Sequence, residues 1–213
     1  MLLADELLDQ YGYNEPIIAN MIDAEKWGVK KESLRRSLNR MVQKNELERY
    51  EEGIYYFSKW NNILKQKTKI SERAVIERKY VKSKNEVYGY LSGLAFANQI
   101  QITTQVPKNL EIVTEKNASK KRKISLRSYT LTLKKPRVDI TQQNYKLLQV
   151  LDLISENEIY KEVSTTILKD RIKNYVCDIK LSKKEIKQII LKYPAKTAKR
   201  LMETEIYDVL MGR

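Results

Sequence analysis

At 213 residues with 42% hydrophobic content, the chain can bury one core of ordinary size or two small ones, so we expect a folded globular protein. Histidine is absent and Cys177 is the only cysteine, which excludes Ser-His-Asp and Cys-His catalysis, histidine-containing zinc sites and an intrachain disulfide, and fits a reducing cytoplasm. The formal net charge of +14 favours a polyanionic partner, but charge alone leaves DNA, RNA, an anionic membrane and an acidic protein open.

The pattern of apolar residues predicts a mostly helical α+β chain. Glycine and proline are scarce, and most segments repeat apolar residues at helical spacing, with a strand-rich stretch near the middle. The N-terminal leucines are interrupted by Asp5, Glu6 and Asp9, which is typical neither of a signal peptide nor of a membrane span. We therefore expect a cytoplasmic protein without a membrane partner. The chain lacks the glycine-rich phosphate-binding motifs, and we expect no cofactor.

Two helices are predicted at the start of the chain. The first ends at Gly12 and has one apolar face, which contains Leu2, Leu3, Leu7 and Leu8. The second begins at Asn14-Glu15-Pro16, where an asparagine cap precedes a proline that a first helical turn tolerates. Its predicted buried face contains Ile17, Ile18, Met21 and Ile22.

A basic helix and a β-hairpin are predicted next. The helix covers residues 31–44, and its apolar face contains Leu34, Leu38, Met41 and Val42. The hairpin joins Leu47–Tyr50 to Ile54–Phe57 through the turn Glu51-Glu52-Gly53. Two helices, a basic helix and a hairpin follow one another in a winged helix-turn-helix, which we predict for residues 1–58.

The polar side of residues 31–44 carries donors that suit duplex DNA. Arginine and asparagine can form paired hydrogen bonds with base edges, while lysine and serine reach phosphates. The predicted DNA-binding residues are Lys30, Lys31, Ser33, Arg35, Arg36, Ser37, Asn39, Arg40, Lys44, Arg49 and Tyr55. Glu51 and Glu52 make the hairpin tip acidic, so Arg49 or Tyr55 supplies any contribution of the wing. The alternative is that this side is only the solvated face of a packing helix.

Two motifs resemble the AbiEi family of antitoxins. The first is the hairpin pattern L-x-R-x-x-x-G-x-Y, formed by Leu47, Arg49, Gly53 and Tyr55. The second, in residues 88–107, resembles the family's pattern Y-x-S-G-x-x-A-x-x-x-x-L-T-T-Q-x-P. The two motifs have the same order as in that family, and the resemblance covers most of residues 10–135.

The resemblance implies a winged-helix transcriptional regulator that is the antitoxin of a type IV toxin-antitoxin system, of the kind involved in abortive infection. Such a protein represses its own operon by binding inverted repeats in double-stranded DNA. It opposes a nucleotidyltransferase-type toxin without forming a stable complex with it. The resemblance weakens after residue 157, so the C-terminal helices are interpreted from their own residues alone.

Residues 59–70 are predicted as a linker because they combine four lysines with few apolar residues. Residues 71–213 are predicted as a second α+β domain with a small antiparallel sheet. Its predicted helices are residues 71–80, residues 87–98, one that starts at Asp139-Ile140-Thr141-Gln142, one capped by Ser182 and a last one after Pro194. Its predicted strands are residues 110–114 and 124–133, the second with a bulge near Arg127-Ser128.

Two groups of basic residues in the second domain are candidates for a second polyanion site. One group belongs to a predicted loop and the other to the C-terminal helices. They are Lys120, Lys121, Arg122 and Lys123, and Lys183, Lys187, Lys199 and Arg200. The alternative for both groups is a mobile or solvated surface that keeps a basic protein soluble.

Two other functions compete with DNA recognition. Asp170, Asp178 and Lys180 include a D-x-K pair of the sort that can bind a divalent ion in a nuclease, but this pattern arises readily by chance in so charged a chain. A winged helix can also bind protein in place of DNA. We expect a protein without enzymatic activity and without a metal site.

Overall fold

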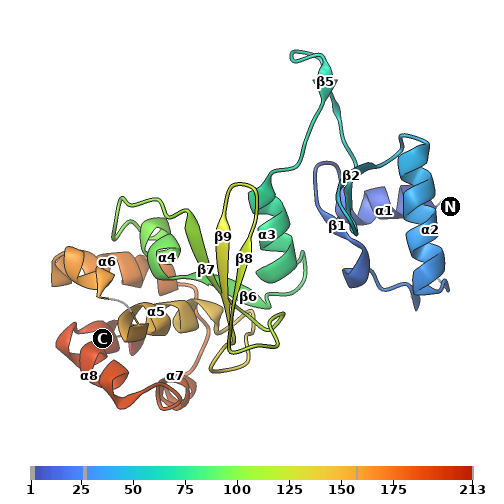
Figure 1. The fold of residues 1–213 in the computed structure, drawn as a ribbon. Helices are drawn as coiled ribbons and strands as arrows, with labels where there is room; N and C mark the ends of the chain where they lie inside the picture. Colours follow the sequence, from blue (N-terminus) through green and yellow to red (C-terminus); the bar gives the residue numbers. More distant parts are fainter. Residues whose placement is uncertain (1–2, 26–27, 157, 213) are drawn as a thin grey trace. The chain divides into compact units, whose positions relative to one another are not determined.

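The computed structural model describes residues 3–25, 28–156 and 158–212. The chain forms two compact units, Met1–Lys79 and Tyr80–Arg213, called here the first and the second unit (Figure 1). The fold class is α+β, as expected. Within the described ranges, no helix is both long and apolar enough to cross a bilayer.

The first unit combines helices with short antiparallel strands. Its elements are α1 (Leu3–Tyr11), β1 (Ile17–Ile18), the 3₁₀ turn η1 (Ala19–Met21), α2 (Lys31–Gln43), β2 (Glu48–Glu51), β3 (Ile54–Tyr56), β4 (Trp60–Asn61), β5 (Gln66–Lys67) and α3 (Glu72–Tyr80). Strands β1, β3 and β2 form one sheet in that order, and β4 pairs with β5. The first predicted helix is confirmed except at Leu2, which lies outside the described residues, and Gly12 ends it with a φ of +84°.

The second predicted helix is wrong. Ile17 and Ile18 are β1 and pair with Tyr55 and Ile54 of β3, and only Ala19–Met21 form a single 3₁₀ turn. β-Branched residues fit a pleated strand better than a helix, and a long-range partner strand was available to them. The predicted apolar face is still largely buried, because Ile17, Ile18 and Ile22 face the core from this extended backbone.

The core of the first unit holds α2 in place. Leu34, Leu38 and Met41 are buried on one face of the helix. They belong to a cluster with Leu7 and Tyr11 of α1 and with side chains of the sheet. Since Leu34 and Leu38 are at most 1% exposed, this face cannot turn toward solvent without opening the core. The predicted basic helix and its apolar stripe are therefore confirmed.

Residues 59–70 are not a structureless linker, because β4 and β5 form a hairpin there. Trp60 pairs with Lys67 and Asn61 with Gln66. After the hairpin, Ile70 is buried together with Val75 of α3 in a cluster that includes residues of β1 and β3. The hairpin and all of α3 except its last residue, Tyr80, thus belong to the first unit, and the boundary between the units follows Lys79.

The second unit contains a four-stranded sheet and a group of helices. Its elements are β6 (Gly89–Ser92), α4 (Gly93–Gln99), β7 (Asn109–Thr114), β8 (Lys121–Ser125), β9 (Thr130–Lys134), α5 (Tyr145–Glu156), η3 (Ile159–Glu162), α6 (Thr165–Val176), α7 (Lys183–Ile190), α8 (Ala195–Glu203) and α9 (Ile206–Leu210). The strand order is β6-β7-β9-β8. The predicted antiparallel sheet is corrected to a mixed one, because β7 and β9 run parallel.

Two predicted elements of the second unit divide differently. Residues 87–98 are not one helix: β6 ends at Ser92, and Gly93, with a φ of +60°, begins α4. The absence of a side chain at Gly89 permits a close approach of the backbone at Tyr80, since a Cβ on Gly89 would lie 2.0 Å from the Tyr80 carbonyl oxygen. Residues 124–133 are a hairpin and not a bulged strand; the turn is closed by Leu126 N–H donating to the Tyr129 carbonyl at 2.8 Å.

Helix α5 is the centre of the second core. All of its residues from Leu147 to Ser155 are buried. The helix shares one apolar cluster with side chains of β6, β7 and the C-terminal helices. The capping box predicted at Ser182 is confirmed, because its hydroxyl accepts from Glu185 N–H and the Glu185 carboxylate accepts from Ser182 N–H.

We expect Leu38→Ala to lower the free energy of unfolding of the first unit by about 2–5 kcal/mol, because it removes a fully buried side chain from under α2. Urea denaturation followed by tryptophan fluorescence measures this, since both tryptophans of the chain, Trp27 and Trp60, belong to the first unit. Gln43→Ala, at an exposed position of the same helix, is the control. Equal midpoints for the two variants would contradict the assigned core.

Candidate nucleic-acid interface

Helix α2 presents a continuous polar face on the side away from its core. Successive residues of a helix are 100° apart, which places Arg36, Asn39, Arg40 and Gln43 opposite the buried leucines. All four side chains are exposed. In the parts of the chain that the structure describes, neither Arg36 nor Arg40 forms an ion pair. Their guanidinium groups can therefore hydrogen-bond a ligand without first breaking an internal pair.

Asn39 is held in position by the neighbouring sheet. The Tyr55 hydroxyl donates to Asn39 Oδ1 at 3.0 Å, and the Tyr55 ring is 3% exposed. Tyr55 was predicted to contact DNA, but its burial makes it a positioning residue for Asn39. Arg49 pairs with Tyr55 across β2 and β3, so both side chains lie on the same face of the sheet. The exposed side chain of Arg49 therefore lies on the same side of the sheet as the hydrogen bond between Tyr55 and Asn39.

The remaining predicted contacts surround this face of α2. Lys30, Lys31 and Ser33 are exposed at the start of the helix, and Lys44 is exposed at its C-cap. Arg35 lies on the flank, where its guanidinium donates to Asn20 Oδ1 at 2.7 Å and links the helix to η1. Ser37 is half-buried. The structure therefore gathers most of the predicted DNA-binding residues on α2 and its two ends.

Two carboxylates of the β2–β3 hairpin are neutralised within the first unit. Glu51 pairs with Lys79 at 3.7 Å, and Glu48 pairs with Lys67 of β5 at 2.6 Å. Both pairs are partly exposed and contribute little to stability. These pairs reduce the negative charge of the hairpin, whose tip was predicted to be acidic because of Glu51 and Glu52.

The predicted basic loop of the second unit is largely an edge strand. Lys121, Arg122 and Lys123 begin β8, and only Lys120 precedes it. Side chains alternate along a strand, so Lys121 and Lys123 lie on one face of the sheet and Arg122 on the other. All four are exposed. The run therefore divides its charge between two faces, although an edge rich in lysine also discourages pairing with another strand.

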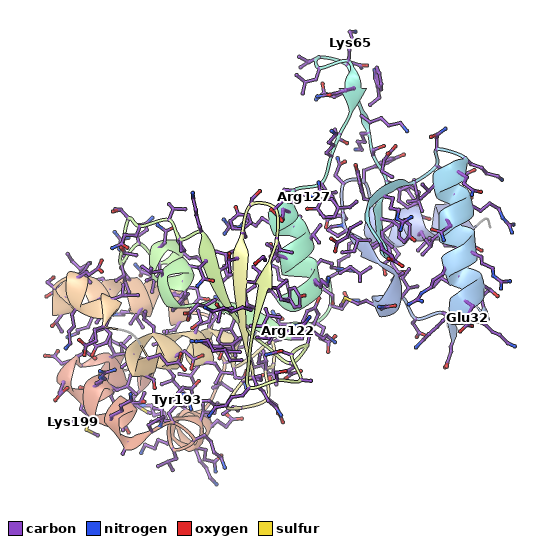
Figure 2. The ribbon with its side chains drawn as sticks, in the orientation of Figure 1. Glu32, Lys65, Arg122, Arg127, Tyr193 and Lys199 are labelled. Atoms are coloured by element: carbon purple, nitrogen blue, oxygen red, sulfur yellow. The ribbon has the colours of Figure 1, made fainter. Side chains whose placement is uncertain are left out.

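The C-terminal basic residues do not join this edge. Lys183 and Lys187 are exposed on α7, and Lys199 forms a pair with Glu203 at 3.7 Å. Figure 2 shows Lys199 and Arg122 on separate parts of the second unit. The eight residues predicted as a second polyanion site are thus not one site.

Arg200 has a structural role that its sequence position did not reveal. Its guanidinium donates to the carbonyl oxygens of Ile154 and Ser155, both at 2.9 Å, and to Glu158 at 3.1 Å. The last carbonyls of a helix have no partner within it, so Arg200 caps the end of α5. The assignment of Arg200 to a polyanion surface is corrected on this ground.

The acidic residues considered for a nuclease are not gathered around one point. Asp178 accepts two hydrogen bonds from Lys146 Nζ, at 2.6 and 2.7 Å, and this lysine lowers the pKa of Asp178. Among the described residues, no three acidic or cysteine side chains come together as metal ligands.

The second unit buries a carboxyl group that the sequence analysis did not single out. Asp152 of α5 is 3% exposed and accepts from the Tyr90 hydroxyl at 2.8 Å. Burial raises the pKa of Asp152 to about 6, against this hydrogen bond, which lowers it. Burial also raises the pKa of Tyr193, and the nearby carboxylate of Asp152 raises it further. A lone aspartate within an apolar helix was the signal for this cluster.

The family assignment rests on a match that spans both units. A family model described as a family of unknown function, DUF6088, matches residues 18–192, which is most of the chain. The chain belongs to the DUF6088 family. The part that matches the DUF6088 model contains α2, Arg49 and β8, whereas Lys199 and Arg200 lie beyond it. No curated protein matches the chain.

We expect the titration of Asp152 to reduce the stability of the second unit as pH rises from about 4 to 6, whereas carboxyl groups with a lowered pKa, such as Glu156, contribute in the opposite direction. The pKa of Asp152 in the folded chain, about 6, exceeds its ordinary value of 3.8, so the fold binds a proton that the unfolded chain releases in this window. The loss reaches about 3 kcal/mol above pH 6, at about 1.4 kcal/mol for each pKa unit.

Asp152→Asn removes this titration and is therefore expected to gain stability relative to the unaltered protein as pH rises. Urea unfolding followed by far-ultraviolet circular dichroism at several pH values measures the difference. Asp170→Asn, at an exposed position of α6, is the control. A stability difference between Asp152→Asn and the unaltered protein that does not change with pH would refute the assignment.

Proposed function

We propose that this protein is a sequence-specific double-stranded-DNA-binding transcriptional repressor, with a winged helix-turn-helix as its first unit and α2 as its recognition helix. The observation that carries the proposal is the outward face of α2, on which Arg36 and Arg40 lack internal ion partners among the described residues and Asn39 is fixed by Tyr55. The strand order β1-β3-β2 behind this helix supports it. A short turn, η1, takes the place of a regular second helix.

A helix of this kind fits the major groove of B-DNA, where every base pair presents a distinct pattern of donors and acceptors. Arg36 and Arg40 suit the two acceptors of guanine. Asn39 suits adenine, which needs one donor and one acceptor. Tyr55 occupies only the Oδ1 acceptor of Asn39 with one hydrogen bond, so the amide nitrogen stays available.

The phosphate contacts are assigned to the residues around the recognition face. They are Lys30, Lys31, Ser33, Lys44 and Arg49, all of which are exposed. Such contacts fix the position of a protein on the duplex and give the complex its salt dependence, but they carry no sequence information. The neutralised hairpin carboxylates support an approach of Arg49 to the backbone.

The antitoxin role is proposed from the two sequence motifs that resemble AbiEi antitoxins. The first motif contains Arg49 and Tyr55. These two residues are paired across β2 and β3, and Tyr55 hydrogen-bonds to Asn39 of α2. The second spans β6 and α4, where Gly93, with its positive φ, permits a sharp strand-to-helix turn. We propose that the protein acts in the cytoplasm, represses its own operon at inverted repeats and opposes a nucleotidyltransferase-type toxin without a stable complex.

The DNA-binding proposal is tested by gel-shift titration with the DNA upstream of its own gene. We expect Arg36→Ala to weaken binding by about 1–3 kcal/mol and to relax specificity at one or two base pairs, because a base contact is lost. We expect Lys44→Ala to weaken binding to all sequences alike and to reduce the slope of log affinity against log salt by about 1.

The control is Arg171→Ala, which removes an exposed arginine of α6 in the second unit and leaves the recognition face intact. It is expected to bind as the unaltered protein does. A protein that shifts no DNA at low salt, or variants at Arg36 and Arg171 with equal affinity for every sequence, would exclude α2 as the recognition helix.

The antitoxin proposal is tested by co-expression with the product of the gene next to its own. We expect that gene to encode a nucleotidyltransferase-like protein that arrests growth when expressed alone, and we expect normal growth when this chain is added. Repression and rescue are separable, so Arg36→Ala is expected to relieve repression and to retain rescue when expressed from an independent promoter. Growth arrest that persists with the unaltered chain present would reject the antitoxin role.

A further inference from the structure

The hairpin of β4 and β5 exposes three large apolar side chains at its end. Trp60 is 60% exposed, Ile63 is 90% exposed and Leu64 is 62% exposed. Figure 2 shows Lys65 at the tip of this hairpin, extended beyond the three-stranded sheet of the first unit. Single exposed apolar residues are normal, but three within five positions of one ordered turn indicate a surface that another molecule covers.

The tip is held in one conformation by its own hydrogen bonds. Asn61 Oδ1 accepts from the backbone N–H groups of Ile63 and Leu64, at 2.9 and 3.0 Å. Lys65 has a φ of +50° and closes the turn. These bonds hold Ile63 and Leu64 side by side without burying them, which lowers the entropy lost when a partner receives them.

The base of the hairpin is anchored on the unit that carries α2. Thr68 hydrogen-bonds to Asn14, and Lys59 Nζ lies 4.8 Å from the centre of the Tyr13 ring. Lys67 pairs with Glu48, the first residue of β2. The next residue of that strand is Arg49, one of the proposed phosphate contacts. The hairpin therefore starts beside the proposed interface and not on an unrelated surface.

The charge of this segment selects a polyanion as the partner. Residues 59–70 contain four lysines and no acidic residue. In the described parts of the chain, Lys65 and Lys69 form no ion pair, and both are exposed. A second copy of this chain carries the same net charge of +14, so electrostatics opposes self-association through this arm and favours a phosphate backbone.

We propose that the β4–β5 hairpin is a DNA-bending arm that enters the minor groove next to the site bound by α2. Its lysines bind phosphates, and Ile63 and Leu64 insert between neighbouring base pairs. Apolar wedges of this type unstack a base step and kink the duplex toward the major groove. The inference rests on the proposed DNA-binding function and adds a second point of contact to it.

The dimensions of the hairpin require the DNA to deform. Three residue steps from Lys59 to Asn62 span about 10 Å at about 3.4 Å each, enough to reach the floor of a groove about 7.5 Å deep. Two paired strands lie about 4.8 Å apart between their backbones alone, and with side chains added the hairpin is wider than a relaxed minor groove of about 6 Å. Entry of the arm therefore opens and bends the groove.

The test compares binding and bending on one duplex, the segment upstream of the gene labelled with a fluorescent dye pair at its ends. The unaltered protein is expected to bind and to increase energy transfer between the dyes. Ile63→Ser combined with Leu64→Ser is expected to bind about tenfold more weakly and to leave energy transfer at the level of free DNA. Leu191→Ser removes an equally exposed leucine side chain, 81% exposed on the second unit, and is expected to match the unaltered protein.

The outcomes separate this inference from the proposed function. DNA that is bound but not bent, or a double variant that bends DNA as the unaltered protein does, overturns the arm and leaves the repressor proposal standing. An unaltered protein that binds no duplex overturns both. In that case, binding to phosphatidylserine vesicles or concentration-dependent dimerisation, lost in the double variant, identifies a membrane or a second copy as the occupant of the tip.

Discussion

The burial of one face of α2 is the constraint on which the candidate interface depends. Leu34, Leu38 and Met41 lie in the core of the first unit, and each is worth about 1.5–3 kcal/mol against exposure. A single solvent-exposed ion pair of an arginine contributes about 1 kcal/mol or less, which is smaller than the burial of any one of these side chains. The core therefore decides the rotation of the helix, and Arg36 and Arg40 point outward whether a ligand is present or not. The orientation of the helix is thus preorganised, and the conformational cost of binding is the ordering of the exposed side chains, about 0.5–1.5 kcal/mol for each.

The internal partners of the basic residues distinguish structural from functional charge better than composition does. In the second unit Lys134 lies between Glu111 and Glu156, Lys146 holds Asp178, and Arg200 caps α5. Those cations are already used by the fold, although they count equally in the net charge. Arg36 and Arg40 of α2 have no such partner among the described residues. Their charges therefore remain available to a ligand, whereas those of Lys134, Lys146 and Arg200 stabilise the fold.

Local signals in the sequence were sufficient for some of the elements that depend on their own residues. The apolar spacing of residues 31–44 and the Ser182 capping box predicted α2 and the start of α7 correctly. The helix predicted from Asn14 failed because Ile17 and Ile18 pair with β3, more than thirty residues away. Tyr55 was predicted to contact DNA because the sequence shows its residue type, a hydrogen-bond donor on the hairpin, but not its burial. Helix α6 was not predicted at all, and the parallel pairing of β7 with β9 leaves no periodic signature in either strand.

Side-chain recognition and DNA deformation supply different kinds of specificity, and the first unit has the residues for both. In the proposed complex, the α2 face distinguishes bases by hydrogen bonds, each of which depends on one side chain. An inserted arm selects sequence through the energy needed to kink the step it enters, which is lowest for flexible pyrimidine–purine steps. The arm and α2 belong to the same compact unit, so the two contacts are part of one body. Together they would specify both a set of base pairs and their distance from a deformable step, which lengthens the recognised sequence without enlarging the protein.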